Sequence, residues 1–322
     1  MASRLHRRTV LTGAAGAAVT ACWPPSLFGQ KAGTRLILLG TGGGPRPKKN
    51  VSAPAQVIVA GGVPYVVDCG DGVARQFVAA GLMLPSLRHV FVTHHHSDHN
   101  ADYGTLLLLA WAAGLRTRVD TWGPPPLERM TRLALELNDA DIAIRIADEG
   151  RVPLAPLLAP HEITRGGVVM QDERVKVTAA LVPHPPVTPS FAYRFDTADR
   201  SVVISGDTSS PFAKAPDDKR SDELIRLAAG ADVLVHEALY LPAVDRIVAS
   251  VPNASTLKQH LIDSHTSAED CGRVAQAAGV KTLVLSHFVP ADDPAVTDQM
   301  WIDAARAHFR GTVVIGKDLM EI

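Results

Sequence analysis

The sequence predicts a mixed α/β fold. Short runs rich in Val, Leu and Ile alternate along most of the chain with stretches of helical periodicity, the pattern of strands followed by helices. The 322 residues suit one large or two small domains, and a composition of 46% hydrophobic and 20% charged residues is typical of a globular protein with a sizeable core. No tandem repeat recurs at the roughly 20–50-residue periods of solenoid proteins.

The first half of the chain contains regular elements in close succession. Runs rich in branched aliphatic residues predict strands at residues 35–39, 56–60, 64–68, 90–92 and 119–122. Helical periodicity predicts helices at residues 73–80, 100–113 and 127–137. Gly81 and Gly114 end the first two helices, because glycine readily takes the left-handed conformation found after a helix. Gly123 and the three prolines after it interrupt regular structure before the third helix.

The second half begins with an irregular segment. Residues 138–171 contain several prolines and show no clear period, so we predict an insertion there at the mouth of the functional site. Strands and helices then alternate again to residue 315. A helix is predicted at residues 267–278, with Glu269 and Asp270 in its first turn, where negative charge suits the helix dipole.

The segment from Thr93 to His99 carries the strongest functional signal. It places His94, His96, Asp98 and His99 in the pattern His-x-His-x-Asp-His, directly after the predicted strand at residues 90–92. Imidazole nitrogens and carboxylate oxygens are ligands that Zn²⁺ accepts. A strand that ends in such a loop can direct these groups at one small volume.

Three more residues of the same kind follow hydrophobic runs further along the chain. They are His184, Asp207 and His287. Loops at strand ends on a rigid scaffold are common positions for catalytic groups. Catalytic zinc takes roughly three protein ligands and keeps one open position, so these residues fill two sites if Asp207 is shared between them. The sequence therefore predicts a binuclear zinc centre.

Further motifs carry a family resemblance. They are Gly40-Thr41-Gly42-Gly43-Gly44, Val66-Val67-Asp68-Cys69-Gly70-Asp71-Gly72, Gly206-Asp207-Thr208, Val235-His236-Glu237-Ala238 and Ser264-His265-Thr266-Ser267. With the histidine motif, they make residues 34–322 resemble the metallo-β-lactamase superfamily and its ribonuclease Z-like branch. Within that branch the chain looks most similar to the exported, metal-dependent arylsulfatases. The resemblance implies a four-layer αβ/βα sandwich and one hydrolase domain over residues 31–322.

The resemblance also implies a role for each site residue. The first zinc would be held by His94, His96 and His184, the second by Asp98, His99 and His287, with Asp207 as the bridge. Asp68 would be a structural residue beneath the site. Glu237 and His265 would form a proton-transfer pair, with Asp98 as a second proton carrier. Two alternatives stay open. His265 could be a structural residue at the entry to a helix, near its N-cap. His236 could be the active partner in proton transfer in place of Glu237.

The expected reaction is hydrolysis. A hydroxide held between two Zn²⁺ ions exists at neutral pH and would attack phosphorus, sulfur or a carbonyl carbon. His265, oriented by Glu237, would protonate the leaving group, since an imidazole is well matched to neutral pH. A metal-binding lipoprotein without turnover is the alternative from another class, and a proton donor beside the ligands argues against it.

Other conspicuous residues are expected to be structural. We expect ordinary surface or half-buried positions for the histidines outside the motifs, which are His89, His161, His260 and His308, whereas His95, in a non-ligand position of the motif, is expected to lie behind the ligands or at the surface. The basic residues Arg46, Lys48 and Lys49 are interpreted as a solvated loop, with attraction of an anionic substrate as the alternative. Core positions are expected for Trp111, Trp122, Trp301, Cys69 and Cys271.

The N-terminus resembles an export signal. Arg7-Arg8 precedes an uncharged run at residues 12–21, which is shorter than the roughly 20 residues that span a bilayer. Residues 1–30 are therefore interpreted as a twin-arginine signal peptide and linker, which predicts a periplasmic or exported protein without a transmembrane span. Cleavage near Ala21 and a lipid anchor at Cys22 are the two interpretations of its end.

The substrate class is inferred from charge and location. The net charge is −1, whereas nucleic-acid enzymes usually carry a basic face. Export, and the lack of a Lys-rich arm like the one that grips tRNA in ribonuclease Z, also argue against nucleic acid. Small anionic esters, as for an arylsulfatase, are the first expectation. A phosphodiesterase or ribonuclease Z-like endonuclease is the alternative, and a lactonase or β-lactamase the weaker third. Resemblance to the ribonuclease Z-like branch also suggests a homodimer. The apolar helical stretch at residues 106–113 could then pack either in the core or at the dimer interface.

Overall fold

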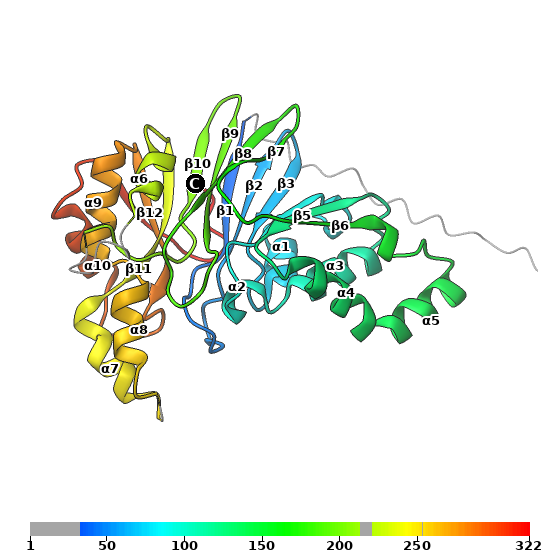
Figure 1. Cartoon of the computed structure of the whole chain (residues 1–322), viewed down its shortest axis with the longest axis horizontal. Coiled ribbons are helices and arrows are strands. Elements are labelled where there is room, and N and C mark those ends of the chain that lie inside the picture. Colours follow the sequence, from blue (N-terminus) through cyan, green and yellow to red (C-terminus); the bar gives the residue numbers. More distant parts are fainter. Residues whose placement is uncertain (1–32, 213–220, 253) are drawn as a thin grey trace, which may run out of the picture. The chain divides into compact units, whose positions relative to one another are not determined.

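Two β-sheets pack face to face at the centre of the structure (Figure 1). This computed structural model describes residues 33–212, 221–252 and 254–322. Residues 33–322 form one compact unit. The predicted signal peptide at residues 1–30, including Cys22, lies outside the described residues. Among the described residues, no helix has both the length and the apolar character that crossing a membrane requires.

The first sheet is built from the N-terminal half of the chain. In spatial order its strands are β1 (Arg35–Gly40), β2 (Ala55–Ala60), β3 (Val63–Val67), β4 (His89–Phe91), β5 (Val119–Gly123) and β6 (Leu158–Glu162). The first three strands are antiparallel, and β3 to β6 are parallel. The loops that follow β3 and β4 therefore leave the same edge of the sheet.

The second sheet comes from the C-terminal half. In spatial order its strands are β13 (Thr312–Ile315), β12 (Thr282–Val289), β11 (Val233–Leu239), β10 (Ser201–Ile204), β9 (Phe191–Thr197), β8 (Val175–Leu181) and β7 (Gly167–Gln171). The strands from β10 to β13 are parallel, and the others are antiparallel. In open α/β sheets, ligands bind outside the carboxyl ends of the parallel strands. The carboxyl ends of β10, β11 and β12 are therefore the expected position of a site.

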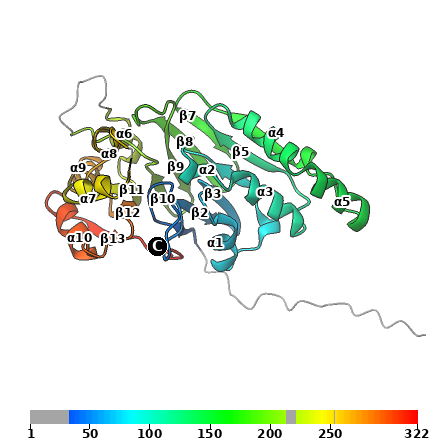
Figure 2. The ribbon, with the colours of Figure 1, turned by 90° about the horizontal axis from the view of Figure 1, so that it is seen from below.

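Helices cover the outer face of each sheet (Figures 1 and 2). On the first sheet lie α1 (Val73–Ala79), α3 (Tyr103–Ala112) and α4 (Leu127–Leu137); α2 (Ser97–Asn100) follows β4, and α5 (Asp139–Glu149) projects beyond the sheet. With the second sheet lie α6 (Glu223–Ala228), α7 (Val244–Ala249), α8 (Leu257–Ser264), α9 (Ala268–Ala278) and α10 (Asp298–Arg306).

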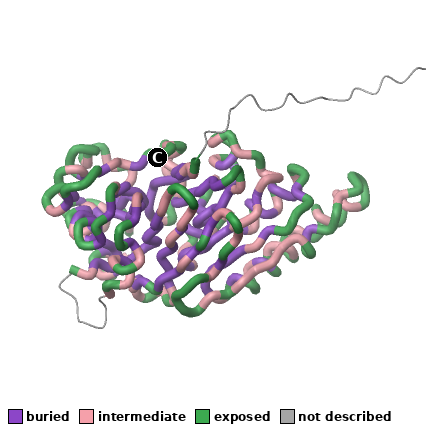
Figure 3. Tube along the Cα trace, turned by 90° about the horizontal axis from the view of Figure 1, so that it is seen from above, coloured by how far each residue is buried: buried purple, intermediate pink, exposed green. Residues whose placement is uncertain are grey.

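Three hydrophobic layers hold the sandwich together. The middle layer joins the sheets through residues such as Phe91 and Tyr193, and the outer layers join each sheet to its helices through residues such as Phe77 and Val274. Figure 3 shows buried strands at the centre and exposed helices outside them. Burial of apolar surface on this scale is the main stabilising contribution. The predicted four-layer αβ/βα sandwich is confirmed.

Two predicted elements need correction. Residues 138–171 are not an insertion at the mouth of the site: they form α5, β6 and β7, and none of them lines the cavity described below. The helix predicted from residue 100 begins at Tyr103. The preceding residues form the short helix α2, and Asp102 accepts a hydrogen bond from the Gly72 backbone at 2.7 Å, which ties the chain to the start of α1.

Candidate metal centre and active site

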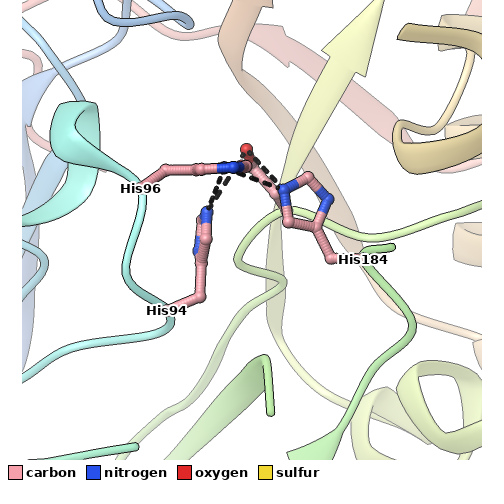
Figure 4. Close-up of side chains that lie close together, drawn as sticks. His94, His96 and His184 are labelled. Carbon is pink, nitrogen blue, oxygen red and sulfur yellow. Dashed lines mark hydrogen bonds and ion pairs between the residues drawn. The ribbon is translucent and has the colours of Figure 1, made fainter. Parts of the chain in front are cut away.

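Three histidines from two loops meet at the edge between the sheets. His94 and His96 follow β4, and His184 lies in the connection between β8 and β9. Nδ1 of His96 lies 3.1 Å from Nε2 of His94 and 3.1 Å from Nε2 of His184. Figure 4 shows the three rings converging. Asp207, which follows β10, completes this first set, whose ligand atoms all lie within 4.8 Å of one another.

A second set lies next to the first. It consists of Asp98 and His99 from α2 and His287 from β12. Nε2 of His287 lies 3.4 Å from Oδ2 of Asp98, and Nε2 of His99 lies 3.8 Å from the same oxygen. All three side chains are buried.

Asp207 faces both sets with different oxygens. Its Oδ2 lies 3.8 Å from Nε2 of His94 and 3.9 Å from Nε2 of His184. Its Oδ1 lies 3.3 Å from Nε2 of His99 and 3.2 Å from Nε2 of His287. One carboxylate is thus placed between two groups of imidazoles, as a bridging ligand would be.

The donor atoms fit divalent metal ions. In the described residues, Nε2 of His99, Oδ1 of Asp207 and both ring nitrogens of His287 are buried without a hydrogen-bond partner. Unpaired buried polar atoms are costly unless another group, such as a metal ion, satisfies them. Burial holds the pKa of His94 well below its usual value and lowers the pKa of His184 to about 4. Both imidazoles are therefore neutral at pH 7, which is the form that binds a metal.

Hydrogen bonds behind the ligands fix their orientation. Asp68 accepts from Nδ1 of His99 at 2.8 Å, and the Thr93 backbone N–H donates to the other oxygen of Asp68 at 2.8 Å. His184 donates from Nδ1 to the Ser264 carbonyl at 2.8 Å. Such carboxylate and carbonyl partners select the tautomer that presents the other ring nitrogen to a metal. The structure thus places Asp68 beneath the site, as the resemblance implies.

His287 reaches the site through a β-bulge. Glu237 pairs with Ser286 across β11 and β12, but the next pair is Ala238 with Phe288, so His287 has no partner in the register. Its φ of 47° is in the left-handed region, which non-glycine residues seldom adopt. Bulges redirect side chains beside functional sites. Gly43 leaves the space for this ring, because a Cβ there would lie 2.5 Å from Nδ1 of His287.

Glu237 and His265 form a buried pair beside the two sets of potential metal ligands. Nδ1 of His265 lies 2.9 Å from Oε2 of Glu237, and Oε1 accepts from the backbone N–H groups of Thr208 and Thr266. Burial would lower the pKa of His265, but the Glu237 carboxylate outweighs it and raises that pKa to about 9. The ring therefore carries a proton at neutral pH.

The same pair could instead belong to a metal site. Glu237 and His265 lie close enough to Asp207 and His287 to form a third set of donors. However, the facing atoms of the pair already bond each other, so coordination would break that bond. The pair is therefore better suited to proton transfer. His236 does not replace Glu237, because its Nδ1 is directed at the Glu237 backbone carbonyl, 2.8 Å away, and the ring lies outside the cavity.

A cavity of about 610 Å³ opens above these residues. Its floor includes His96, Asp98, Asp207, His265 and His287. Arg46, Lys48 and Arg246 also line it, so two residues of the basic loop are at the site, and Arg46 is at the same time exposed, as the solvated-loop interpretation predicts. Lys48 donates from Nζ to the carbonyls of Gly44 and Arg46, at 2.9 and 3.0 Å, which holds its charge near Asp98.

His260 is a cavity residue that was not predicted from the sequence. It lies on α8, lines the cavity, and its ring centroid is 5.7 Å from that of His265 and 6.0 Å from that of His96. Its only sequence signal is its position five residues before His265, which is not a recognised motif. The remaining histidines of the described residues make structural contacts: His95 with Pro124, His89 with Tyr65, His161 with Asp120 and His308 with Glu269.

Comparisons with known proteins agree with this geometry. Residues 65–288 match the sequence model of the β-lactamase superfamily domain. Ribonuclease Z of Mycobacterium bovis (strain BCG / Pasteur 1173P2) is 33% identical over 290 residues, covering 89% of this chain and 97% of the relative. Ribonuclease Z of Mycobacterium avium (strain 104) is 35% identical over the same shares. The chain belongs to the metallo-β-lactamase superfamily. Within it, the ribonuclease Z-like branch fits.

Solved structures of this superfamily have the same fold. The metallo-β-lactamase fold protein YhfI from Bacillus subtilis has a TM-score of 0.65 at 19% identity, covering 90% of this chain and 98% of its own. The short form of human tRNase Z has a TM-score of 0.63 at 20% identity, covering 89% of this chain and 98% of its own. The predicted ester hydrolase is confirmed, and the superfamily supports a metal-binding site, whereas closeness to the arylsulfatases is not shown.

The expectation about nucleic acid was wrong. The small net charge argued against a nucleic-acid substrate, but the relatives are ribonucleases. A net charge sums over the whole surface and does not report the local field at a cleft. Here Arg46 and Lys48 lie together at one cavity, whereas Arg246 at its mouth is paired with Asp293, in a chain whose acidic and basic residues nearly balance.

Proposed function

We propose that this protein is a metal-dependent phosphodiesterase that cleaves RNA. The observation that carries the proposal is a cavity with two adjacent sets of potential metal ligands, a shared Asp207 and His265, bonded to Glu237, at its floor. Arg46 and Lys48 at the rim suit a polyanion. The similarity to ribonuclease Z, over 89% of this chain, selects a phosphodiester of RNA among the esters that such a site could hydrolyse.

We propose two Zn²⁺ ions per chain as the cofactor. His94, His96 and His184 would hold the first, Asp98, His99 and His287 the second, and Asp207 both. Mixed imidazole and carboxylate donors suit zinc. When bound, such ions lower the pKa of water and stabilise negative charge that develops on the phosphoryl oxygens.

The protein's own residues would supply orientation and the proton. Arg46 and Lys48 at the rim would attract the phosphodiester anion, whereas Arg246 is already paired with Asp293. His265 uses Nδ1 for Glu237, which leaves Nε2 to donate a proton to the departing oxygen. The positive charge on the ring would persist until that transfer, because Glu237 is fixed by two backbone N–H groups and stabilises it.

A substrate panel with the metal-loaded protein tests the activity. We expect cleavage of a single-stranded RNA and of an aryl phosphodiester, loss of both activities with a chelator, and recovery when zinc is added back. An aryl sulfate and a lactone serve as competing substrates at the same concentration. A chelator-sensitive preference for the sulfate would replace the proposal with the arylsulfatase interpretation. No hydrolysis of any ester would favour a metal-binding protein.

We also propose that the protein is exported. Arg7-Arg8 and the uncharged run at residues 12–21 support this proposal. Folding around a metal in the cytoplasm before export would suit the twin-arginine route. Fractionation of cells that express the chain should recover the mature protein outside the cytoplasm, and Arg7→Lys with Arg8→Lys should retain it inside. Equal distribution of both forms would contradict export by this route.

A further inference from the structure

The α7–α8 hairpin forms one wall of the cavity. On α8, Leu257, His260, Leu261 and Ser264 are spaced so that they share one face of the helix. The first three line the cavity, and the Ser264 carbonyl accepts the hydrogen bond from His184. The helix face that orients a predicted metal ligand therefore continues directly into the cavity wall.

This wall is apolar and firmly supported. Leu239, Val244, Leu261 and Val289 form a small buried cluster, and Ile247 and Leu257 pack against it while lining the cavity. Figure 1 shows α7 and α8 projecting together beyond the end of β11. Across the mouth, the Arg246 guanidinium bonds Oδ2 of Asp293 at 2.8 and 3.1 Å, which connects α7 to the loop after β12.

The wall and the floor differ in chemistry. The reacting phosphate needs the charged floor and the basic rim, whereas Ile247, Leu257 and Leu261 offer nothing to an anion. Apolar side chains favour an uncharged group that leaves water. In RNA that group is the base. The ring of His260, between Leu257 and Leu261 on the same helix face, adds a surface on which a base can stack.

We propose that the α7–α8 hairpin is a base-binding subsite that takes an unpaired nucleobase next to the scissile phosphodiester. Bases in a duplex are stacked and paired inside the helix, whereas unpaired bases can be splayed out and reach an enclosed wall. A cavity of about 610 Å³ has the size that small ligands fill. It therefore suits individual nucleotides of a single strand better than a paired duplex. The subsite makes the enzyme selective for single-stranded RNA, and it rests on the proposed phosphodiesterase activity.

The test compares substrates that differ by one base. The metal-loaded wild type and Leu257→Asn are assayed with adenylyl-(3′,5′)-adenosine and with the methyl esters of adenosine 3′-phosphate and 5′-phosphate, each of which lacks one base. We expect kcat/KM of the variant to fall about tenfold for the dinucleotide and for the ester that keeps the bound base. The other ester should lose less than about threefold, because it leaves the subsite empty.

Matched variants separate this result from a general defect. Ile262→Asn makes a similar change on the same helix, at a side chain that is 40% exposed and outside the cavity, and should leave all three rates unchanged. Ile247→Asn provides a second test of the wall if Leu257→Asn does not fold. Equal losses on all three substrates, no loss on any, or equal cleavage of a single strand and its duplex would overturn the subsite. A wild type that cleaves none of these diesters would refute the proposed function instead.

Discussion

His265→Ala is expected to lower kcat by roughly 10²–10⁴-fold while the metal content stays unchanged. The ring donates a proton in the proposed reaction and has no place in either of the two predicted ligand sets that share Asp207. Its bond of 2.9 Å to Glu237 occupies the atom that faces the metal-binding residues. The measurement is kcat on the aryl phosphodiester, with zinc determined on the same sample.

His308→Ala is the matched control for this variant. It removes an imidazole that also bonds a glutamate, Glu269, but on the surface away from the cavity. Its activity should equal that of the wild type. A loss of zinc from His265→Ala would instead assign His265 as a ligand in the third donor set.

The pH profile gives a second readout for the pair. Because Glu237 raises the pKa of His265 to about 9, activity that needs the protonated ring is present at neutral pH and is lost as pH rises through that pKa. Glu237→Gln removes the negative charge, so the loss should begin at a lower pH. If activity falls at the same high pH in Glu237→Gln as in the wild type, Glu237 does not control the protonation of His265.

Asp207→Ala is expected to lose both metal ions and the stability that they provide. The carboxylate lies between the two sets of imidazoles, within 3.9 Å of four of them. A ligand that binds only the folded state stabilises it by about 4 kcal/mol when its free concentration is about 1,000 times Kd. The variant should therefore melt at the same temperature with and without added zinc, whereas the wild type should melt higher with zinc.

Two comparisons support the interpretation of that result. Asp303→Ala removes an exposed carboxylate of α10 that bonds Gln299, and it should keep both the zinc content and the response to zinc. Asp207→Asn preserves the shape of the side chain if the alanine variant does not fold. Wild-type zinc stoichiometry in both Asp207 variants would show that Asp207 is not the bridge.

The clustering of these histidines and aspartates was predictable because most of them lie at or shortly after the end of a short hydrophobic strand. His94, Asp207 and His287 lie far apart in the sequence, yet parallel strands bring their carboxyl ends to one edge, and here two sheets share that edge. The alternation of strands and helices predicted the fold class for the same reason. Buried strands need apolar runs, and those runs are visible without a structure.

The cavity wall was not predictable in this way. Leu257 and Leu261 are four residues apart, the spacing found on the apolar face of any amphipathic helix. That spacing does not indicate whether the face packs in a core or lines a cavity. His260 carries no motif, and Arg46 is recognisable as a site residue only after its loop folds over the metal-binding residues. Residues 138–171 were misjudged because their prolines and mixed pattern conceal two edge strands, β6 and β7, whose stability comes from neighbours in other parts of the chain.

By itself, the sequence determined the superfamily, the layered sandwich and the identity of the clustered histidines and aspartates. These features depend on local patterns: hydrophobic periodicity and side-chain chemistry at strand ends. Only the tertiary structure decided which oxygen of Asp207 faces which imidazoles, how a bulge turns His287 inward, and which helix face forms the wall of the cavity. Those features depend on distances between segments far apart in the chain, which packing sets and no local pattern encodes.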